Sequence, residues 1–377
     1  MLSIREISSR GQFMEMNREW DDVLERCKDR NIFLTWEYLS TYWKHFGNGK
    51  RLRILVIEDT GNIIAIAPLR QSRYGSLGPL GYDVIEPLGY RGLTPEGADY
   101  TGLILTEREA ECTELFMKHL LGDVSWDFMY LMDVPDTSKD PTLLASIARQ
   151  LSLKFELERG AMCPYIPIPR SLDVFLNTLS PKFRKNLRRC MSNLEKNCGK
   201  VKLVKYDELG SIEESMQVFF DLHQKRWKLK RKPGVFDTQE IRDFYLDVAK
   251  RFANSGWLAL YFLTVNDEPI ATQYCFEYKQ RMYYTLGGFE PNYSEYSVGN
   301  LVTLKVIEKC IEKGIEEYDL LKGGETYKSR FTAKYRSNLG IRLANKRLIS
   351  NFYHYGIRTL KRTKMNRLLD KFGTRYS

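Results

Sequence analysis

The fold of this 377-residue chain is decided by residues 282–314, which read MYYTLGGFEPNYSEYSVGNLVTLKVIEKCIEKG. The stretch opens with an apolar, strand-like run at Met282–Leu286 and turns at Gly287-Gly288. An amphipathic helix follows from Val298 and ends at Gly314. Its apolar positions share one face, formed by Leu301, Leu304, Ile307, Cys310 and Ile311. A strand that leads through a turn into a helix is typical of an α/β protein.

The start of this helix is a candidate phosphate site. The free backbone N–H groups of a first helical turn converge with the positive end of the helix dipole, so they favour an anion. Ser297 is a suitable N-cap, and Gly299 permits close backbone approach to a ligand. With Val298 and Asn300 they form the predicted cofactor-binding turn. An ordinary capped helix after a strand has the same pattern, and the residues alone leave both interpretations open.

Helical and strand-like patterns alternate along the rest of the chain, which predicts a mixed α/β fold. In the first half, two helices precede a hairpin that turns at residues 59–62. In the second half, four helices precede three strands at residues 257–265, 268–278 and 280–287. The prolines of residues 163–169 predict a linker or a sheet edge between the halves. The shared order of elements predicts two tandem domains, residues 1–158 and 159–345, and a tail at 346–377.

Composition excludes several protein classes. The hydrophobic fraction of 43% and the charged fraction of 28% are those of a folded chain. No run approaches the roughly 18 apolar residues that span a bilayer, and the first residues lack a signal-peptide pattern, so we expect a cytoplasmic protein. Seven scattered cysteines and four histidines show no paired spacing, so we expect no metal site and no disulfide framework.

The basic charge lies at the end of the chain. From Ile341 to Ser377 there are ten Lys or Arg and one acid, which is +9 of the net +10. Apolar residues alternate with these cations, a pattern typical of a basic amphipathic helix on an anionic membrane surface. The alternative is a helix packed on the second domain. The nearly neutral body and the absence of a recognisable motif argue against nucleic-acid binding.

Several stretches resemble a known family. They are FLTWEYL at residues 33–39, LSPKFRKNLRR at 179–189, and YDLLKG at 318–323 followed by Tyr327-Lys328. Over residues 15–345 the chain resembles GNAT acyltransferases of the CelD-like branch, which is associated with cellulose and exopolysaccharide genes and related to Fem-type peptidoglycan aminoacyltransferases. The GNAT pyrophosphate fingerprint, Arg/Gln-x-x-Gly-x-Gly/Ala, is matched loosely at Glu295–Asn300, which has a Gly but lacks the Arg/Gln and the second Gly.

The resemblance implies an acyl-CoA-dependent N-acyltransferase, with acetyl-CoA as the default co-substrate and no metal. The implied acceptor is an amine of a sugar or cell-surface polysaccharide precursor, as a small molecule or linked to a lipid. One alternative is Fem-type transfer from an aminoacyl-tRNA, the one nucleic acid that stays open. Another is a non-catalytic GNAT-like scaffold in polysaccharide assembly. The expected location is the cytoplasm, with the tail allowing contact with the inner membrane face.

Direct acyl transfer needs a base for the amine and an acid for the departing thiolate. The catalytic candidates are His223, Glu277, Tyr284 and Asp319. Each has a structural alternative. His223 could be a hydrogen-bonded core histidine, and Glu277 a solvated carboxylate at the end of a strand. Tyr284 is one tyrosine among 23, and Asp319 could be paired with Lys322 or Lys328.

Basic residues supply the substrate-binding candidates. They are Arg184 and Arg188 on a basic helix, Arg226 and Trp227 in the run KRWKLKRK, and Lys328. Cations here would bind phosphate groups of a donor or acceptor, and Trp227 would stack on a sugar or a base. The alternative is a solvated helix face.

Overall fold

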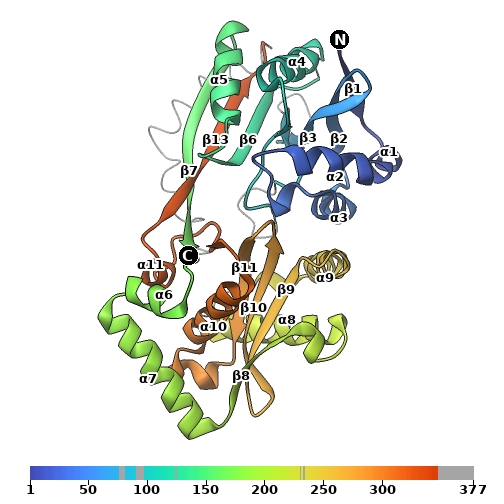
Figure 1. Cartoon of the computed structure of the whole chain (residues 1–377). Helices are drawn as coiled ribbons and strands as arrows, with labels where there is room; N and C mark the ends of the chain where they lie inside the picture. The colour runs from blue at the N-terminus through green and yellow to red at the C-terminus, as the bar shows by residue number, and fades with distance from the viewer. Residues whose placement is uncertain (76–80, 91–96, 124, 230, 232–233, 347–377) are drawn as a thin grey trace. The chain divides into compact units, whose positions relative to one another are not determined.

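The computed structural model describes residues 1–75, 81–90, 97–123, 125–229, 231 and 234–346. The chain forms two compact units (Figure 1). Unit 1 consists of Met1–Ala161 and the chain from Arg336 onwards, and unit 2 is Met162–Tyr335. The predicted helical tail at 346–377 lies outside the described residues, apart from Lys346.

Unit 1 is built on a mixed sheet with the strand order β1-β2-β3-β4-β6-β13-β7, and β5 pairs with β3. Its strands are β1 (Leu2–Ile7), β2 (Arg51–Asp59), β3 (Asn62–Tyr74), β4 (Tyr82–Pro87), β5 (Ile104–Leu105), β6 (Phe128–Pro135), β7 (Lys154–Pro167, shared with unit 2) and β13 (Tyr335–Ala344). Its helices are α1 (Arg10–Glu15), α2 (Asn17–Arg26), η1 (Ile32–Leu34), α3 (Trp36–Phe46), α4 (Glu109–Gly122) and α5 (Asp140–Gln150). Side chains of α4 and α5 pack with β2, β3 and β6 in one core.

The β2–β3 hairpin forms where the sequence predicts it. Thr60 and Gly61 both have positive φ, 48° and 86°, which the tight turn between twisted antiparallel strands requires. Farther along the chain, Ile104–Leu105 pairs with β3 as the short strand β5.

Unit 2 has the strand order β7-β12-β11-β10-β9-β8, in which only β11 and β12 are parallel. Its strands are β8 (Val201–Lys205), β9 (Leu258–Val265), β10 (Glu268–Tyr278), β11 (Arg281–Phe289) and β12 (Glu317–Asp319). Its helices are α6 (Leu172–Thr178), α7 (Pro181–Cys198), η2 (Tyr206–Glu208), α8 (Ile212–Leu229), η3 (Val235–Asp237), α9 (Gln239–Asn254), η4 (Pro291–Tyr296), α10 (Val298–Lys313) and α11 (Lys328–Phe331).

Alternation along the strands gives the sheet of unit 2 two apolar faces. On one face, Tyr261, Cys275 and Tyr284 pack with α7 and α10 in a continuous core. On the other, Tyr274 stacks on Phe219 of α8 at 5.1 Å between ring centroids. Two-sided burial explains why these strands read as nearly continuous apolar runs.

Beyond Tyr283, one edge of β11 has no strand partner among the described residues. The parallel neighbour β12 pairs with Arg281, Met282 and Tyr283 only, while β11 continues to Phe289. The freed part of β11 carries Gly287-Gly288, and α10 begins shortly after it. This geometry positions the candidate site.

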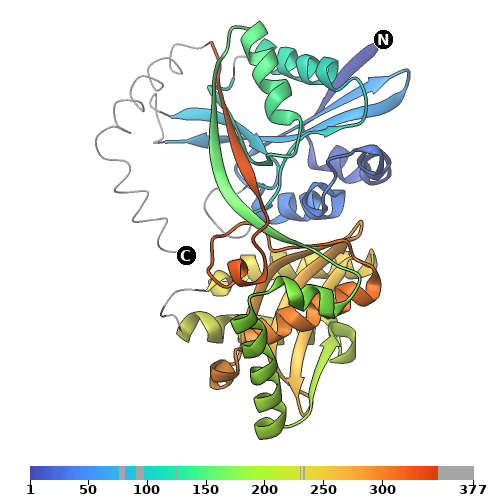
Figure 2. The ribbon, with the colours of Figure 1, turned by 60° about the vertical axis from the view of Figure 1, so that its left-hand side comes forward.

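Two strands correct the predicted domain boundaries. The proline-rich stretch predicted as a linker or edge forms the end of β7, where Tyr165–Pro167 pair with β12 at the edge of the unit 2 sheet. β13 was missed, and it pairs with β6, so the chain returns to unit 1 after Tyr335 rather than staying in the second domain to 345 (Figure 2). Among the described helices, none is long and apolar enough to cross a membrane.

Candidate functional site

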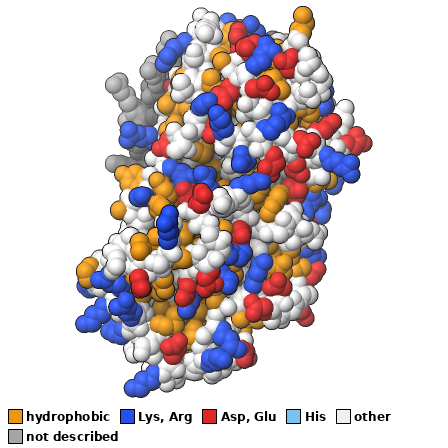
Figure 3. All heavy atoms as spheres, in the orientation of Figure 1, with side chains coloured by type: hydrophobic (Ala, Val, Ile, Leu, Met, Phe, Trp, Pro, Cys, Tyr) orange, Lys and Arg blue, Asp and Glu red, His pale blue; other side chains and the backbone are white. Residues whose placement is uncertain are grey.

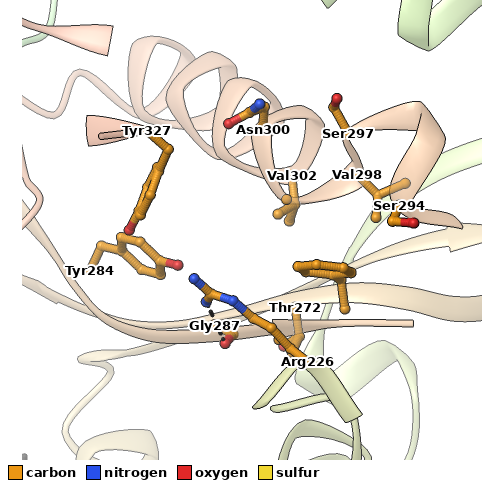
Figure 4. Close-up of a pocket in the computed structure, with 13 residues that line it drawn as sticks. Arg226, Thr272, Tyr284, Gly287, Ser294, Ser297, Val298, Asn300, Val302 and Tyr327 are labelled. Carbon is orange, nitrogen blue, oxygen red and sulfur yellow. Dashed lines mark hydrogen bonds between the residues drawn. The ribbon is translucent and has the colours of Figure 1, made fainter. Parts of the chain in front are cut away.

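A pocket of about 220 Å³ opens in unit 2 beside the freed end of β11 and the start of α10 (Figure 4). Arg226 comes from α8, Thr272 from β10, and Tyr327 from the turn before α11. The other lining residues are Tyr284, Gly287, Gly288 and Phe289 of β11, Ser294 of η4, and Ser297, Val298, Gly299, Asn300 and Val302 around the start of α10. The four residues predicted to bind the cofactor thus lie together at the pocket.

The N-terminus of α10 is open to an anion. Ser297 precedes it in a left-handed conformation, with φ 53° and ψ 40°, and its side chain makes no cap hydrogen bond with any described residue, contrary to the predicted role. The N–H groups of Asn300 and Leu301 bind the Ser297 carbonyl. The N–H groups of Val298 and Gly299 have no carbonyl within the helix to donate to, because they lie in its first turn. The first turn contains no acidic residue, so nothing on it repels a phosphate.

Glycines allow the close packing beneath the pocket. A Cβ on Gly288 would lie 2.3 Å from the backbone nitrogen of His223, so α8 could not approach β11 as it does. A Cβ on Gly287 would lie 2.5 Å from the Tyr284 hydroxyl. Gly299 differs, because its Cβ would meet only the Phe289 ring at 3.7 Å. The first two glycines are required by packing, whereas the third leaves space at the helix start.

Two side chains of α8 share one carbonyl of β11. Nη1 of Arg226 donates to the Gly287 oxygen at 3.0 Å, and Nδ1 of His223 lies 3.1 Å from the same oxygen and donates to it. Burial lowers the pKa of His223 to about 3, with a smaller contribution from the Arg226 charge. The imidazole is therefore neutral at physiological pH. His223 is 1% exposed and lies under β11 rather than in the pocket lining, so it positions the Gly287 peptide.

Two tyrosine side chains, Tyr284 of β11 and Tyr327, lie side by side at one end of the pocket (Figure 4). Burial raises the pKa of both phenols, so both keep their protons. In Figure 4 the Tyr284 hydroxyl lies beside the Arg226 guanidinium. Tyr327 was not a site candidate, although it stood in the Tyr327-Lys328 pair of the family resemblance.

The other three acidic or basic candidates of this region serve local structure. Glu277 ends β10 in an ion pair with Lys313 at 2.5 Å, as a strand-end carboxylate would. Asp319 is fully buried and accepts the Leu321 N–H at 2.8 Å, which holds a turn where Leu321 has φ 56°. Lys328 donates to the Lys322 carbonyl at 3.0 Å and pairs with Glu325 at 2.9 Å. Glu277, Asp319 and Lys328 are absent from the pocket lining that the structure describes.

The remaining substrate-binding candidates also lie elsewhere. Arg184 donates to the Asn177 side chain at 2.5 Å, and Arg188 is exposed. Figure 3 shows Lys and Arg side chains gathered over α7, whose apolar face is buried in the core. Trp227 packs beside His223 with 6.0 Å between ring centroids. Arg226 is therefore the one substrate-binding candidate in the described pocket lining.

The pocket combines an anion-friendly helix start, a guanidinium and two neutral phenols. Its described lining contains no carboxylate and no imidazole. Within the described residues, no group of three or more Cys, His, Asp or Glu is arranged to hold a metal ion. The titratable side chains of the described lining are therefore the guanidinium of Arg226 and the phenols of Tyr284 and Tyr327.

Comparison with known proteins identifies the kind of domain. Residues 181–329, which include every lining residue, match the acetyltransferase (GNAT) domain family. Among curated proteins, none matches the sequence. The match to the GNAT domain family confirms the predicted mixed α/β fold and the predicted enzyme class, an acyltransferase with a GNAT domain.

Solved structures are similar over nearly the whole chain. A crystal structure of FemX matches with a TM-score of 0.64 and 12% identity, covering 94% of this chain and 99% of FemX. The C-terminal domain of a putative lysylphosphatidylglycerol synthetase from Agrobacterium fabrum matches with a TM-score of 0.51 and 11% identity, covering 90% and 93%. L-PGS from Bacillus licheniformis matches at 0.51 and 11% identity, covering 87% and 91%. At these identities the likeness concerns the fold.

Proposed function

We propose that unit 2 is an acyl-CoA-dependent N-acyltransferase, with acetyl-CoA as the default donor. The acceptor in this proposal is an amine of a sugar or cell-surface polysaccharide precursor, as in the CelD-like branch. The observation that carries the proposal is the uncapped, acid-free start of α10 at the mouth of a pocket that ends at two protonated tyrosines.

The helix start fits the pyrophosphate of CoA. The N–H groups of Val298 and Gly299 and the helix dipole favour an anion, and the space above Gly299 lets phosphate oxygens approach the backbone. Ser297 and Ser294 add hydroxyl groups to the same wall. No acid of the first turn opposes the charge.

The free edge of β11 fits the extended arm of the donor. Between Tyr284 and Phe289, the backbone groups of β11 that point away from β10 have no β12 partner. The Gly287 carbonyl already accepts from Arg226 and His223, and an arm with amide groups can pair with the remaining groups as an added strand does. Such an arm would run from the start of α10 toward Gly287 and the tyrosine hydroxyls. The thioester would then lie within reach of Tyr284.

The chemistry proceeds by direct transfer. The nitrogen lone pair of the acceptor attacks the thioester carbonyl, the carbon–sulfur bond breaks, and the thiolate takes a proton from Tyr284. The ammonium proton leaves through water to the tyrosinate, and Tyr327 lies beside it in the pocket. The products are an amide and free CoA, and both tyrosines end protonated. His223 orients the Gly287 peptide in this scheme and transfers no proton.

The fold likeness to FemX favours one alternative, transfer from an aminoacyl-tRNA as in Fem-type enzymes. Such a donor also brings phosphates, and its binding would weaken steeply with salt. A non-catalytic scaffold, the other alternative, would bind neither donor. An acyl-CoA donor places the reaction in the cytoplasm. Contact of residues 346–377 with the inner membrane face stays a prediction about residues outside the described ranges.

Isothermal titration calorimetry with acetyl-CoA tests the proposal. The wild-type chain should bind with a sub-millimolar Kd. Gly299→Glu should weaken binding more than a hundredfold, because two unit charges 4 Å apart repel by about 4 kcal/mol at an effective dielectric of 20. Gly11→Glu is the matched control, since Gly11 is the second residue of α1, as Gly299 is of α10, and also faces open space.

Three results are informative. Absence of wild-type binding sinks the CoA proposal, and salt-sensitive binding of aminoacyl-tRNA in its place supports the Fem-type alternative. Unchanged affinity in Gly299→Glu moves the donor away from the start of α10. Loss of affinity in Gly11→Glu as well would mean that a new carboxylate disturbs the chain generally.

A further inference from the structure

We propose that Arg226 binds an anionic oxygen group of the acceptor, a carboxylate or a phosphate attached close to the reacting amine. The acceptor class is then an acidic amine, such as an amino acid or a phosphorylated amino sugar. The assignment to the acceptor rests on the proposed function, because that function places the phosphates of the donor at the start of α10.

The guanidinium of Arg226 is held in place and has donors to spare. Nη1 donates to the Gly287 carbonyl at 3.0 Å, and Cζ lies 5.9 Å from the centroid of the Phe289 ring. A guanidinium carries five N–H donors in a planar fork. Within the described residues, the Gly287 oxygen is its hydrogen-bond acceptor, so Nε and Nη2 remain to bind a ligand. Figure 4 shows the group inside the pocket, beside Tyr284.

No carboxylate of the described residues forms an ion pair with this guanidinium. Lys225, the preceding residue on α8, pairs with Glu290 at 2.7 Å, whereas Arg226 pairs with no acid among the described residues. The described pocket lining also contains no Asp or Glu. A half-buried guanidinium loses part of its hydration, and an incoming anion restores the lost interactions. The fork geometry matches the two oxygens of a carboxylate or a phosphate.

The position of Arg226 favours the acceptor over the donor. The helix start that receives the donor phosphates belongs to α10, while Arg226 extends from α8 against Gly287 on β11. The neighbouring group is the Tyr284 hydroxyl, which protonates the departing thiolate in the proposed reaction. An anion on Arg226 is therefore near the reacting atoms rather than near the pyrophosphate. His223 shares the Gly287 carbonyl and so helps to fix the fork before binding.

Arg242 supplies a matched control. Its Nε donates to the Phe236 carbonyl at 3.0 Å, and its Cζ lies 5.9 Å from the Phe220 ring. These contacts repeat those of Arg226 with a carbonyl and a phenyl ring. Arg242 does not belong to the described pocket lining. If removing a half-buried arginine has a general effect, substitutions of Arg226 and of Arg242 will both show it. Loss of an anion site will appear only when Arg226 is substituted.

The experiment is a calorimetric titration of the full-length chain with inorganic phosphate, in the presence of saturating CoA and at constant ionic strength set by sodium chloride. We expect Arg226→Gln to weaken phosphate binding about ten- to a hundredfold, the usual range for hydrogen bonds to a charged group. Arg226→Lys should be intermediate, because it keeps the charge and loses the fork. Arg242→Gln should bind phosphate as the wild type does.

A second titration separates the two ligand chemistries. N-acetylglycine is compared with N-acetylglycinamide, and N-acetylglucosamine 6-phosphate with N-acetylglucosamine, each added to the CoA complex. If N-acetylglycine binds more tightly than its amide, and Arg226→Gln removes the difference, the acceptor carries a carboxylate. If N-acetylglucosamine 6-phosphate binds more tightly than the neutral sugar, and Arg226→Gln removes the difference, the acceptor carries a phosphate. Equal binding of both members in both pairs overturns the proposal.

Failure of this proposal is distinguishable from failure of the proposed function. If phosphate binds neither variant nor wild type, or binds all equally, Arg226 holds no anion. If Arg226→Gln lowers the affinity for CoA itself, the arginine serves the donor, and the acceptor assignment is wrong while the acyl-CoA function stands. If the wild type binds phosphate through Arg226 but does not bind CoA, the function is wrong and the anion site stands without an acceptor assignment.

Discussion

The two units contain helices that begin in the same way but differ in charge. In unit 1, α4 lies in sequence between the parallel strands β4 and β6, and in unit 2, α10 lies between the parallel strands β11 and β12. Each helix follows a left-handed residue, Arg108 with φ 49° and ψ 36°, and Ser297 with φ 53° and ψ 40°. Neither side chain caps its helix through a hydrogen bond to a described residue.

The first turns show why one unit offers a phosphate site. In α4, Glu109 pairs with Lys139 at 2.7 Å, and Glu111 pairs with Arg108 at 2.6 Å. Those carboxylates occupy the positive end of the helix dipole and would repel a phosphate. The first turn of α10 has no acid and has Gly299 at its second position. The charge of the first turn, more than the backbone geometry, therefore distinguishes unit 2, the proposed donor-binding unit, from unit 1.

The largest expected effect tests the packing that shapes unit 2. Gly288→Ala puts a methyl group 2.3 Å from the His223 nitrogen and 2.4 Å from the Leu222 carbonyl carbon, so α8 or β11 must move. We expect the free energy of unfolding of unit 2 to fall by about 3 kcal/mol, the upper end for overpacking. Gly11→Ala in unit 1, with open space around it, should unfold as the wild type does or slightly later. Urea unfolding measures both, and wild-type stability of Gly288→Ala would contradict the close approach.

A substitution that gives α10 the first-turn acid of α4 should have a medium effect. Asn300 holds the third helical position, which Glu111 holds in α4. Asn300→Glu should weaken acetyl-CoA binding about tenfold, roughly the 1.4 kcal/mol of one misplaced surface charge, and less at high salt. Glu111→Asn in unit 1 should leave the affinity unchanged. Titration calorimetry at two salt concentrations decides, and equal affinity in Asn300→Glu would refute the role of first-turn charge.

A smaller effect is that the stabilities of the two units depend on pH in opposite directions. Burial raises the pKa of Asp140 in unit 1 to about 7 from 3.8, and burial lowers the pKa of His223 in unit 2 to about 3 from 6.5. Stability from Asp140 is present below pH 3.8 and is lost as pH rises through 7. Stability from His223 is present above pH 6.5 and is lost as pH falls toward 3. Between pH 4 and 6.5 the two contributions therefore change in opposite directions.

Two variants measure those directions. Relative to the wild type, Asp140→Asn should gain stability as pH rises from 5 to 7, and His223→Asn should gain as pH falls from 7 to 5. Each gain should be about 1 kcal/mol per pH unit, near the limit for one titrating group. Urea unfolding at both pH values gives the free energies. If the stability of either variant changes in the opposite direction relative to the wild type, the pKa of Asp140 is not raised, or that of His223 is not lowered, in the folded chain.

Local patterns predicted most of the fold of unit 2. The helix expected at Val298–Lys313 has those bounds, because its apolar face and the Gly314 stop are local signals. β13 could not be predicted in the same way, since its partner β6 lies about two hundred residues away and no local pattern reports that pairing. The prolines before residue 168 were compatible with a strand because that part of β7 pairs at the edge of the unit 2 sheet.

The site was predictable where one short segment builds it. Ser297–Asn300, which were predicted to bind the cofactor, line the pocket, and Tyr284 and Arg226 join them from other elements. Tyr327 was missed because it reaches the pocket from a turn that sequence spacing does not locate. His223, Glu277 and Asp319 have residue types suited to catalysis, yet burial and local partners assign them to structure. Those partners depend on the folded chain: the Gly287 carbonyl, Lys313 and the Leu321 N–H.

Hydrogen–deuterium exchange of the full chain, with and without acetyl-CoA, tests most directly whether unit 2 holds the donor. We expect slower exchange at residues 294–302 and at residues 284–289 of β11. We expect no change at residues 108–113, where α4 begins with its two glutamates. Slower exchange at the start of α4, or no protection at the start of α10 under conditions where acetyl-CoA binds, would contradict the account.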